Sequence, residues 1–352
     1  MRSILELQKK LAPDIVDLIK KRYTILRQIR YSPGVGRRAL ASALQMTERV
    51  LRAETEFLKR QGLLEVDASG MRLSGSGQQL LDDLEAVASE WFGLAELEER
   101  IRAHYKLRQV VVVPGDTNRD PQTKRELGRA GAAALMKAAQ AAERPSADAD
   151  PLVVAVTGGT TLVEVAQHLQ SAPALKSALF VPARGGLGER VELQAGTIVS
   201  AMAARTGGEY RLMHVPDDVG EESIASLMNE PHIREVADIV RRARIVVHGI
   251  GEALVMAQRR RVDEGTVRKL REGGAVAEAF GYYFDRSGKA IHRMPTVGLG
   301  IDDIERTETV IAVAGGASKA PSIAAVLEAG HEDVLILDEA AAHGIINLII
   351  SL

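Results

Sequence analysis

The stretch VVAVTGGTTLVEVAQH, residues 153–168, decides the fold of most of this chain. Its first four residues are apolar, as in a strand buried on both faces, and its last nine repeat apolar residues at helical spacing. A short glycine turn joins the two pieces. A strand followed directly by a helix is the repeating unit of an α/β fold, so the stretch predicts a parallel sheet covered by helices.

Further apolar runs follow the same plan. They lie at residues 178–183, 245–250, 309–316 and 333–338, and helical stretches separate most of them. Continuous apolar strands that alternate with helices are typical of a parallel sheet with both faces covered. The sequence therefore predicts a Rossmann-like α/β domain over residues 108–352.

The glycine turn of the opening stretch is suited to an anion. A helix that begins after a buried strand points unpaired N–H groups and the positive end of its dipole outward. Gly158 and Gly159 let a ligand approach the backbone, while Thr160 and Thr161 add hydroxyl donors and a helix cap. Many α/β units are closed by such turns without binding anything, so this turn alone does not predict a ligand.

Other glycine loops follow the later strands, at residues 184–188, 248–251 and 315–319. The carboxyl ends of parallel strands share one edge of a sheet, so we expect these loops to form a common crevice. Arg184 and Lys319 lie next to the glycines. A bidentate arginine and a point-charge lysine beside a helix N-terminus predict a phosphorylated ligand, with one or two phosphates.

More polar side chains belong to the predicted crevice. The run Arg259, Arg260 and Arg261 is expected to supply at most one ligand contact, its other members being solvated. Gln194 and Glu278 are candidates for binding the hydroxyls of a sugar, although Glu278 is equally compatible with a surface charge on a helix. Taken together, the convergent groups predict a site for an anionic small molecule.

Composition narrows the class of protein. The 352 residues are 46% hydrophobic and 26% charged, which is typical of a soluble protein of two or more domains. The absence of cysteine excludes disulfides, thiolate zinc sites and cysteine nucleophiles. No apolar run reaches the length of a membrane span, and the first residues lack the core of a signal peptide. We expect a cytoplasmic protein with no membrane partner.

The net charge of −2 conceals two parts of opposite sign. Residues 1–75 contain 15 Lys and Arg against 8 Asp and Glu, whereas the remainder contains 30 against 39. A basic segment joined to an acidic one suggests that the first part meets a polyanion such as double-stranded DNA. The alternative is a basic surface that is merely solvated.

The basic segment, residues 1–76, has the pattern of a winged helix-turn-helix. Helical spacing predicts helices over 13–31, 36–45 and 48–61. Two short strand-like pieces, 63–66 and 71–73, flank a turn and would form the wing. The expected DNA contacts are the cations of the second and third helices and the threonine that caps the third. These residues are Arg37, Arg38, Thr47, Arg49, Arg52, Lys59 and Arg60. A protein-docking module is the alternative for this domain.

Residues 77–107 predict a helical linker. Its apolar residues recur every three or four positions, as in a helix that pairs with another helix, and Glu98 interrupts the repeat. The repeat consists of Leu80, Leu84, Val87, Trp91, Leu94 and Ile101. The segment is expected either to form a homodimer or homotetramer, matching a palindromic operator, or to pack on its own C-terminal domain.

An enzyme is the main alternative function. The loop His248-Gly249-Ile250-Gly251 resembles one in glucosamine-phosphate deaminases, but the Asp-Gly-His that carries their chemistry is missing. Glu252 and Glu278 are the only evident candidates for a general base, and His248 at a strand end is more typical of a packed residue. The sequence predicts no catalytic residue, no metal site and no cofactor.

The combination of a basic winged helix-turn-helix with the motifs TGGTT, ARGG, HGIG and GGASKA resembles the SorC family of bacterial transcription regulators. The resemblance spans essentially the whole chain. It implies a repressor of glycolytic genes whose C-terminal domain has the fold of sugar-phosphate isomerases and deaminases without their activity. It also implies that fructose 1,6-bisphosphate is the effector and that it weakens operator binding.

The resemblance further implies a set of effector-binding residues. One phosphate would lie on Gly158, Gly159, Thr160, Thr161 and Lys319. The rest of the ligand would contact Arg184, Gly185, Gly186, Gln194, Arg259 and Glu278. Recognition-helix residues vary with the operator, so the resemblance adds little to the DNA contacts expected from the residues themselves.

Overall fold

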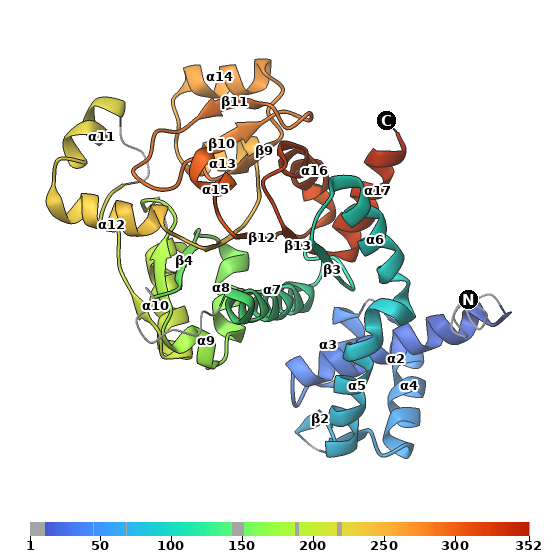
Figure 1. Ribbon diagram of the computed structural model, residues 1–352. Coiled ribbons are helices and arrows are strands. Elements are labelled where there is room, and N and C mark those ends of the chain that lie inside the picture. The colour runs from blue at the N-terminus through green and yellow to red at the C-terminus, as the bar shows by residue number, and fades with distance from the viewer. Residues whose placement is uncertain are drawn as a thin grey trace. The chain divides into compact units, whose positions relative to one another are not determined.

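The computed structural model describes residues 11–44, 46–67, 69–142, 151–186, 190–216 and 220–351. The chain forms two compact units, Met1–Ala95 and Glu96–Leu352, drawn from blue to red along the chain in Figure 1. The division falls inside the segment 77–107. Ala68 and Gly188, expected in turns, lie outside the described residues, as do the side chains of Val87 and Trp91.

The first unit contains four helices and a hairpin among its described residues. They are α2 (Pro13–Tyr31), α3 (Arg37–Ala43), α4 (Glu48–Arg60), β1 (Leu64–Asp67), β2 (Gly70–Leu73) and α5 (Gly75–Phe92). Apolar side chains from all six elements meet in one core, which includes Ile25, Leu40, Leu51 and Leu64. The predicted winged helix-turn-helix is confirmed, with α4 in the position of the recognition helix.

The predicted linker helix is broken into two. α5 ends at Phe92 and α6 (Leu94–Tyr105) begins after Gly93, whose φ of +76° lies in the left-handed region that favours glycine. Arg30 on α2 pairs with Asp82 of α5 at 2.9 Å, which holds α5 to the first unit. Glu98, which interrupts the apolar repeat, accepts a hydrogen bond from the N–H of Val112 at 2.9 Å. Its carboxylate thus anchors α6 to the second unit, while the role of this segment in oligomerisation stays a prediction.

The second unit is built on a seven-stranded sheet with the strand order β3-β13-β12-β7-β4-β5-β6. Every neighbouring pair runs parallel, which confirms the predicted α/β class. The strands are β3 (Gln109–Val113), β4 (Val153–Val156), β5 (Leu179–Pro182), β6 (Glu209–Tyr210), β7 (Ile245–His248), β12 (Thr309–Val313) and β13 (Val334–Asp338). Strands β4, β7 and β13 are buried along their whole length because helices cover both faces.

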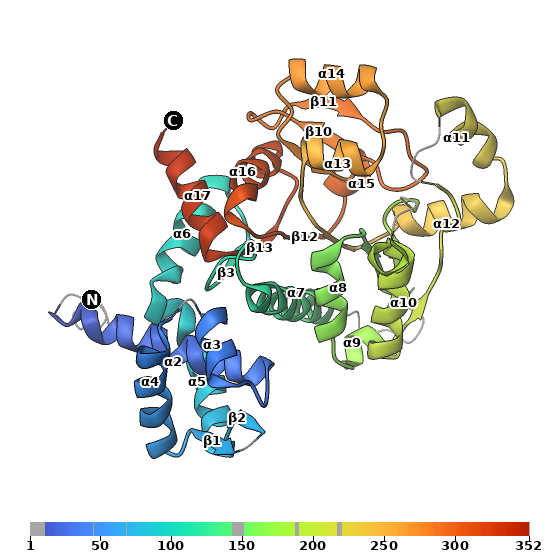
Figure 2. The same cartoon turned by 180° about the vertical axis from the view of Figure 1, so that it is seen from behind.

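Figures 1 and 2 show α7 and α8 on one side of this sheet and α16 and α17 on the other. The helices of the sheet are α7 (Pro121–Ala142), α8 (Thr160–His168), α9 (Pro173–Lys176), α10 (Ala195–Thr206), α11 (Glu221–Leu227), α12 (Pro231–Arg241), α16 (Ala320–Ala329) and α17 (Glu339–Ile350). Short 3-10 turns, η1 (Val191–Leu193) and η2 (Ala317–Lys319), precede α10 and α16. The N-termini of α8 and α16 therefore lie at the carboxyl edge of the sheet.

A second sheet, which the sequence analysis did not predict, is inserted between β7 and β12. It is antiparallel with the order β11-β10-β9-β8. Its elements are β8 (Gly251–Glu252), α13 (Ala253–Arg259), α14 (Glu264–Glu272), β9 (Ala277–Ala279), β10 (Tyr282–Phe284), β11 (Ala290–Arg293) and the following α15 (Ile301–Glu305). Strands of two to four residues are too short to show a periodicity of two in the sequence.

Candidate functional site

The glycine loops of the second unit line one pocket at the carboxyl edge of the parallel sheet. The loops after β4, β5 and β7 contribute, together with η2 and strand β9 of the small sheet. The lining includes nearly all the predicted effector residues, namely Gly158, Gly159, Thr160, Thr161, Arg184, Gly185, Gln194, Arg259, Glu278 and Lys319. Gly186 lies beside the lining, where a Cβ would be 3.4 Å from Oε1 of Gln194.

The Gly158-Gly159 turn leaves the N-terminus of α8 open to the pocket. Gly159 is the N-cap residue, and its φ of +128° is one that only glycine adopts readily. Its N–H donates to the carbonyl of Leu193 at 2.9 Å, which fixes the turn against η1. The predicted threonine cap is wrong, because Thr160 and Thr161 are the first two residues of the helix and no side-chain cap is made there.

Two lysines approach this helix N-terminus. Lys319 of η2 donates from Nζ to the carbonyl of Ile250 at 2.9 Å. Lys124 of α7, which the sequence analysis did not single out, donates from Nζ to Oγ1 of Thr160 at 3.3 Å. Burial lowers the pKa of Lys319; Glu252 acts against this, and the charges of Lys124 and Arg259 add to it. The pocket thus concentrates positive charge near Thr160.

The expectation that all but one of the three consecutive arginines are solvated is wrong, because two of them line the pocket. Arg259 and Arg260 belong to the lining, whereas Arg261 lies in an outer groove formed with α14. Arg260 Nη2 donates to Oε1 of Glu278 at 2.8 Å, and both side chains are 6% exposed. The same oxygen accepts the N–H of Gly281 at 2.7 Å. Glu278 is therefore a buried residue of strand β9, and the alternative of a surface charge on a helix is wrong.

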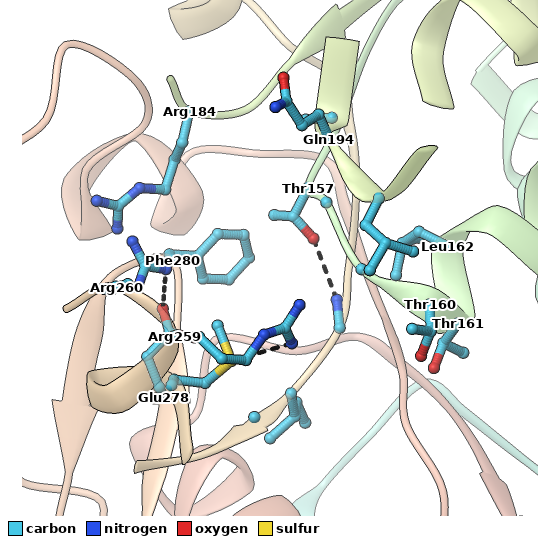
Figure 3. A pocket seen from close by; sticks show the side chains of 18 of the residues that line it. Thr157, Thr160, Thr161, Leu162, Arg184, Gln194, Arg259, Arg260, Glu278 and Phe280 are labelled. Carbon is cyan, nitrogen blue, oxygen red and sulfur yellow. Dashed lines mark hydrogen bonds and ion pairs between the residues drawn. The ribbon is translucent and has the colours of Figure 1, made fainter. Parts of the chain in front are cut away.

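Arg184 is also buried, with 5% of its surface exposed. Its guanidinium lies directly against Gly281, where a Cβ would overlap it. Figure 3 shows Arg184, Arg259 and Arg260 on one side of the pocket and the two threonines of α8 on the other. Guanidinium groups at one end and a helix N-terminus at the other give the pocket two places for an anionic group.

The histidine of the HGIG loop is packed away from the pocket lining. His248 is fully buried, its ring is 4.2 Å from that of Phe280, and Nε2 is 3.5 Å from Oε1 of Glu332. Phe280, not His248, lines the pocket. No group of three or more His, Cys, Asp or Glu in the described part of the chain could hold a metal ion.

The first unit presents a basic face on α3 and α4. All seven residues predicted to contact DNA are exposed. Arg38 pairs with Glu48 at 3.2 Å and Arg52 with Glu56 at 2.8 Å, both at the surface. Thr47 caps α4 by accepting the N–H of Val50 at 3.3 Å. Val50 is 41% exposed on the same helix and is an apolar group that the sequence analysis missed.

Two other cations of this unit form ion pairs within its own fold. Lys21 and Arg22 of α2 contact the carboxylate of Glu54 at 2.6 and 2.9 Å. Burial acts to raise the pKa of Glu54, but the hydrogen bonds from Lys21 and Arg22 outweigh it and the pKa is lowered. Leu51 and Leu58, on the same side of α4 as Glu54, are buried in the core. The opposite side of α4 is left for a partner.

Comparison with known proteins identifies both units. The family described as "CggR N-terminal DNA binding domain" matches residues 18–88, and the family described as "Putative sugar-binding domain" matches residues 89–347. The SorC family transcriptional regulator from Enterococcus faecalis, a solved structure, is 36% identical with a TM-score of 0.64, covering 71% of this chain and 99% of that one. The chain belongs to the SorC family of transcriptional regulators.

Other SorC relatives span the whole length. The central glycolytic genes regulator of Priestia megaterium is 44% identical over 349 residues, covering 99% of each chain. The protein of that name from Bacillus subtilis is 41% identical, covering 97% of this chain and 98% of its own. The full-length sorbitol operon regulator from Klebsiella pneumoniae has a TM-score of 0.63 over 93% of this chain and 97% of its own; at 15% identity it shows the fold alone.

Membership of the SorC family decides between the functions left open by the sequence. The chain is a transcription regulator with a DNA-binding domain and a sugar-binding domain. The named relatives are regulators and not enzymes, in agreement with the prediction that this chain is not an enzyme. In the described part of the chain, no helix is both long and apolar enough to cross a membrane.

Proposed function

We propose that this chain is a cytoplasmic repressor of glycolytic genes whose operator binding is weakened by fructose 1,6-bisphosphate. Two full-length relatives carry the name central glycolytic genes regulator. The choice of ligand rests on the pocket, which has arginines on one side and the open N-terminus of α8 on the other. A sugar with two phosphates matches both ends, whereas a monophosphate satisfies one.

At the α8 end, one phosphate would accept hydrogen bonds from the N-terminal N–H groups of the helix. Gly158 and Gly159 allow the oxygens to approach the backbone, and Thr160 and Thr161 add their hydroxyls. Lys319 would supply the counter-charge. Its partly buried ammonium group, which now donates to a carbonyl, gains a charged acceptor when the phosphate arrives.

At the other end, Arg184 and Arg259 would hold the second phosphate. Gln194 and Glu278 would bind hydroxyls of the sugar between the two ends. Glu278 is already oriented by Arg260 and by the N–H of Gly281, so its second oxygen is held in place before the ligand binds. Gly185 and Gly186 would let the ligand pass close to the loop after β5.

On the DNA side, the exposed face of α4 would enter the major groove. Arg49 and Arg52 would reach base edges, and the remaining cations, together with Thr47, would contact phosphates. The remaining cations are Arg37, Arg38, Lys59 and Arg60. We propose a homodimer or homotetramer, because a palindromic operator requires two such units related by two-fold symmetry.

The effector can act only by binding the DNA-free arrangement of the subunits more tightly than the DNA-bound one. The test uses full-length protein on a fluorescent duplex selected by that protein from a random DNA library. Addition of fructose 1,6-bisphosphate should lower the anisotropy at a fixed protein concentration. Fructose 6-phosphate is the matched control and should require a far higher concentration.

Two outcomes would contradict the proposal. One is a duplex that stays bound at saturating bisphosphate, which would exclude this ligand as the effector. The other is equal release by both sugars, which would exclude the second phosphate contact. Assaying the same samples for sugar-phosphate products checks independently that the pocket binds without turnover.

A further inference from the structure

We propose that Lys124 is a further ligand of the effector phosphate and forms, with Lys319, a pair of ammonium groups near the α8 N-terminus. This inference rests on the proposed binding of a phosphate at Thr160. It adds a residue from α7, a helix that contributes nothing to the predicted effector set.

Close packing of α7 on α8 places Lys124 beside Thr160, a residue of the pocket lining. A Cβ at Gly128 would lie 2.5 Å from the Cβ of Glu164, and one at Gly131 would lie 2.8 Å from Cγ2 of Val165. Glycines at these two positions let the helices approach closely. Both helices follow parallel strands, so they run in the same direction. Lys124, one turn before Gly128, is therefore level with Thr160, one turn before Glu164.

The side chains of Lys124 and Thr160 are in contact. Nζ of Lys124 donates to Oγ1 of Thr160 at 3.3 Å, a long hydrogen bond to a neutral hydroxyl. Thr160 lines the pocket at the first turn of α8. A phosphate oxygen bound at this turn comes within reach of the same ammonium group, and a charged acceptor is stronger than the hydroxyl.

The charges near Thr160 also favour an anion. Lys319 donates to the neutral carbonyl of Ile250, and Lys124 is close enough to lower the pKa of Lys319. Two ammonium groups and the positive end of α8 therefore repel one another until a negative ligand binds. A phosphate, with close to two negative charges at pH 7, removes that repulsion. The pair thus selects a phosphate over a neutral sugar hydroxyl.

The experiment compares Lys124→Gln with Lys137→Gln in the full-length protein. Lys137 is the matched control, because it lies on the same helix, is exposed, and donates to Gln109 at 3.1 Å outside the pocket. Calorimetry with fructose 1,6-bisphosphate should show that Lys124→Gln weakens binding about tenfold or more, the effect of one charged hydrogen bond. Lys124→Arg should restore most of the affinity, and Lys137→Gln should leave it unchanged.

A second measurement needs no substitution. Acetic anhydride labelling of the wild-type protein, read by mass spectrometry, should show Lys124 and Lys319 protected by fructose 1,6-bisphosphate and by millimolar inorganic phosphate, with Lys137 labelled as before. Protection of Lys319 without Lys124, or equal affinities of the two glutamine variants, would overturn the inference while leaving the proposed function intact. Failure of both bisphosphate and inorganic phosphate to protect either lysine would overturn both.

Discussion

The basic face of the first unit and the pocket of the second both gather cations, but they do so in opposite ways. On α3 and α4 the cations are exposed and several pair with neighbouring carboxylates, as Arg52 does with Glu56. In the pocket Arg184 and Arg260 are almost fully buried, and the N-terminal N–H groups of α8 add further positive charge.

This difference reflects the two ligands. DNA is long and uniformly charged, so exposed arginines gain affinity through many weak, salt-dependent contacts. A small metabolite offers few contacts, so each must be desolvated and held in position before binding. Substitutions should therefore have large single effects in the pocket and smaller, additive effects on the DNA face.

The largest effect is expected for Lys319→Ala. Loss of a buried charged hydrogen bond to phosphate should weaken fructose 1,6-bisphosphate binding about 100-fold, corresponding to about 3 kcal/mol. Calorimetry measures the affinity. Binding of the ligand-free variant to operator DNA should equal that of the wild type, and a joint loss of both activities would indicate misfolding instead.

A smaller effect, on stability, is expected for Glu54→Gln. This variant removes the carboxylate that Lys21 and Arg22 contact, and it therefore tests whether these two cations stabilise the fold. The lowered pKa of Glu54 means that its ionised form stabilises the fold above the unfolded pKa, and that this contribution is lost as pH falls through the folded pKa. The variant should be less stable at pH 7 by about 1–2 kcal/mol.

Denaturant unfolding at pH 7 and at pH 3 tests this expectation. The gap between wild type and Glu54→Gln should narrow at the lower pH, because protonation of Glu54 removes its ion pairs. A gap that persists unchanged would show that packing, and not the ion pair with Lys21 and Arg22, determines the loss.

On the DNA face, Arg49→Ala should weaken operator binding about tenfold, with little effect on bisphosphate affinity. If Arg49 contacts a base, the loss should fall on one operator position. If it contacts a phosphate, the loss should be uniform and the slope of log affinity against log salt should fall by about one. Anisotropy at several salt concentrations distinguishes the two, and Arg72→Ala on β2 serves as a control for a change of net charge alone.

The smallest effect is expected for Thr47→Ala, which removes the side-chain acceptor at the start of α4. Loss of an N-cap costs about 1 kcal/mol of stability. Thermal unfolding should show this decrease, and Thr47→Ser should recover most of it. Because Thr47 is also proposed to contact a DNA phosphate, operator affinity should fall as well, and an unchanged operator affinity would show that Thr47 acts as a helix cap alone.

The sequence was most informative where local rules and tertiary packing agree. Helix α2 begins at Pro13 and ends at Tyr31 as expected, since Pro13 suits the first turn and Ser32-Pro33-Gly34 ends the helix. The loops around Gly158 and Lys319 were expected to meet, since parallel strands bring their carboxyl ends to one edge.

The sequence was least informative where a contact depends on distant packing. Lys124 reaches Thr160 only because Gly128 lets two helices approach, and no local pattern near Lys124 indicates this. The short strands around Glu278 have no usable periodicity, so a strand residue was equally compatible with a helix. The break at Gly93 was missed because the apolar repeat continues across it.

We propose that one pocket in each chain binds both phosphates of a single sugar and senses the sugar without converting it. Calorimetric titration of the full-length protein with fructose 1,6-bisphosphate and with fructose 6-phosphate tests this most directly. We expect one bisphosphate bound per chain. The affinity for the monophosphate should be about 100-fold lower than that for the bisphosphate, because a charged group is lost at one end of the pocket. Equal affinities for the two sugars would contradict it.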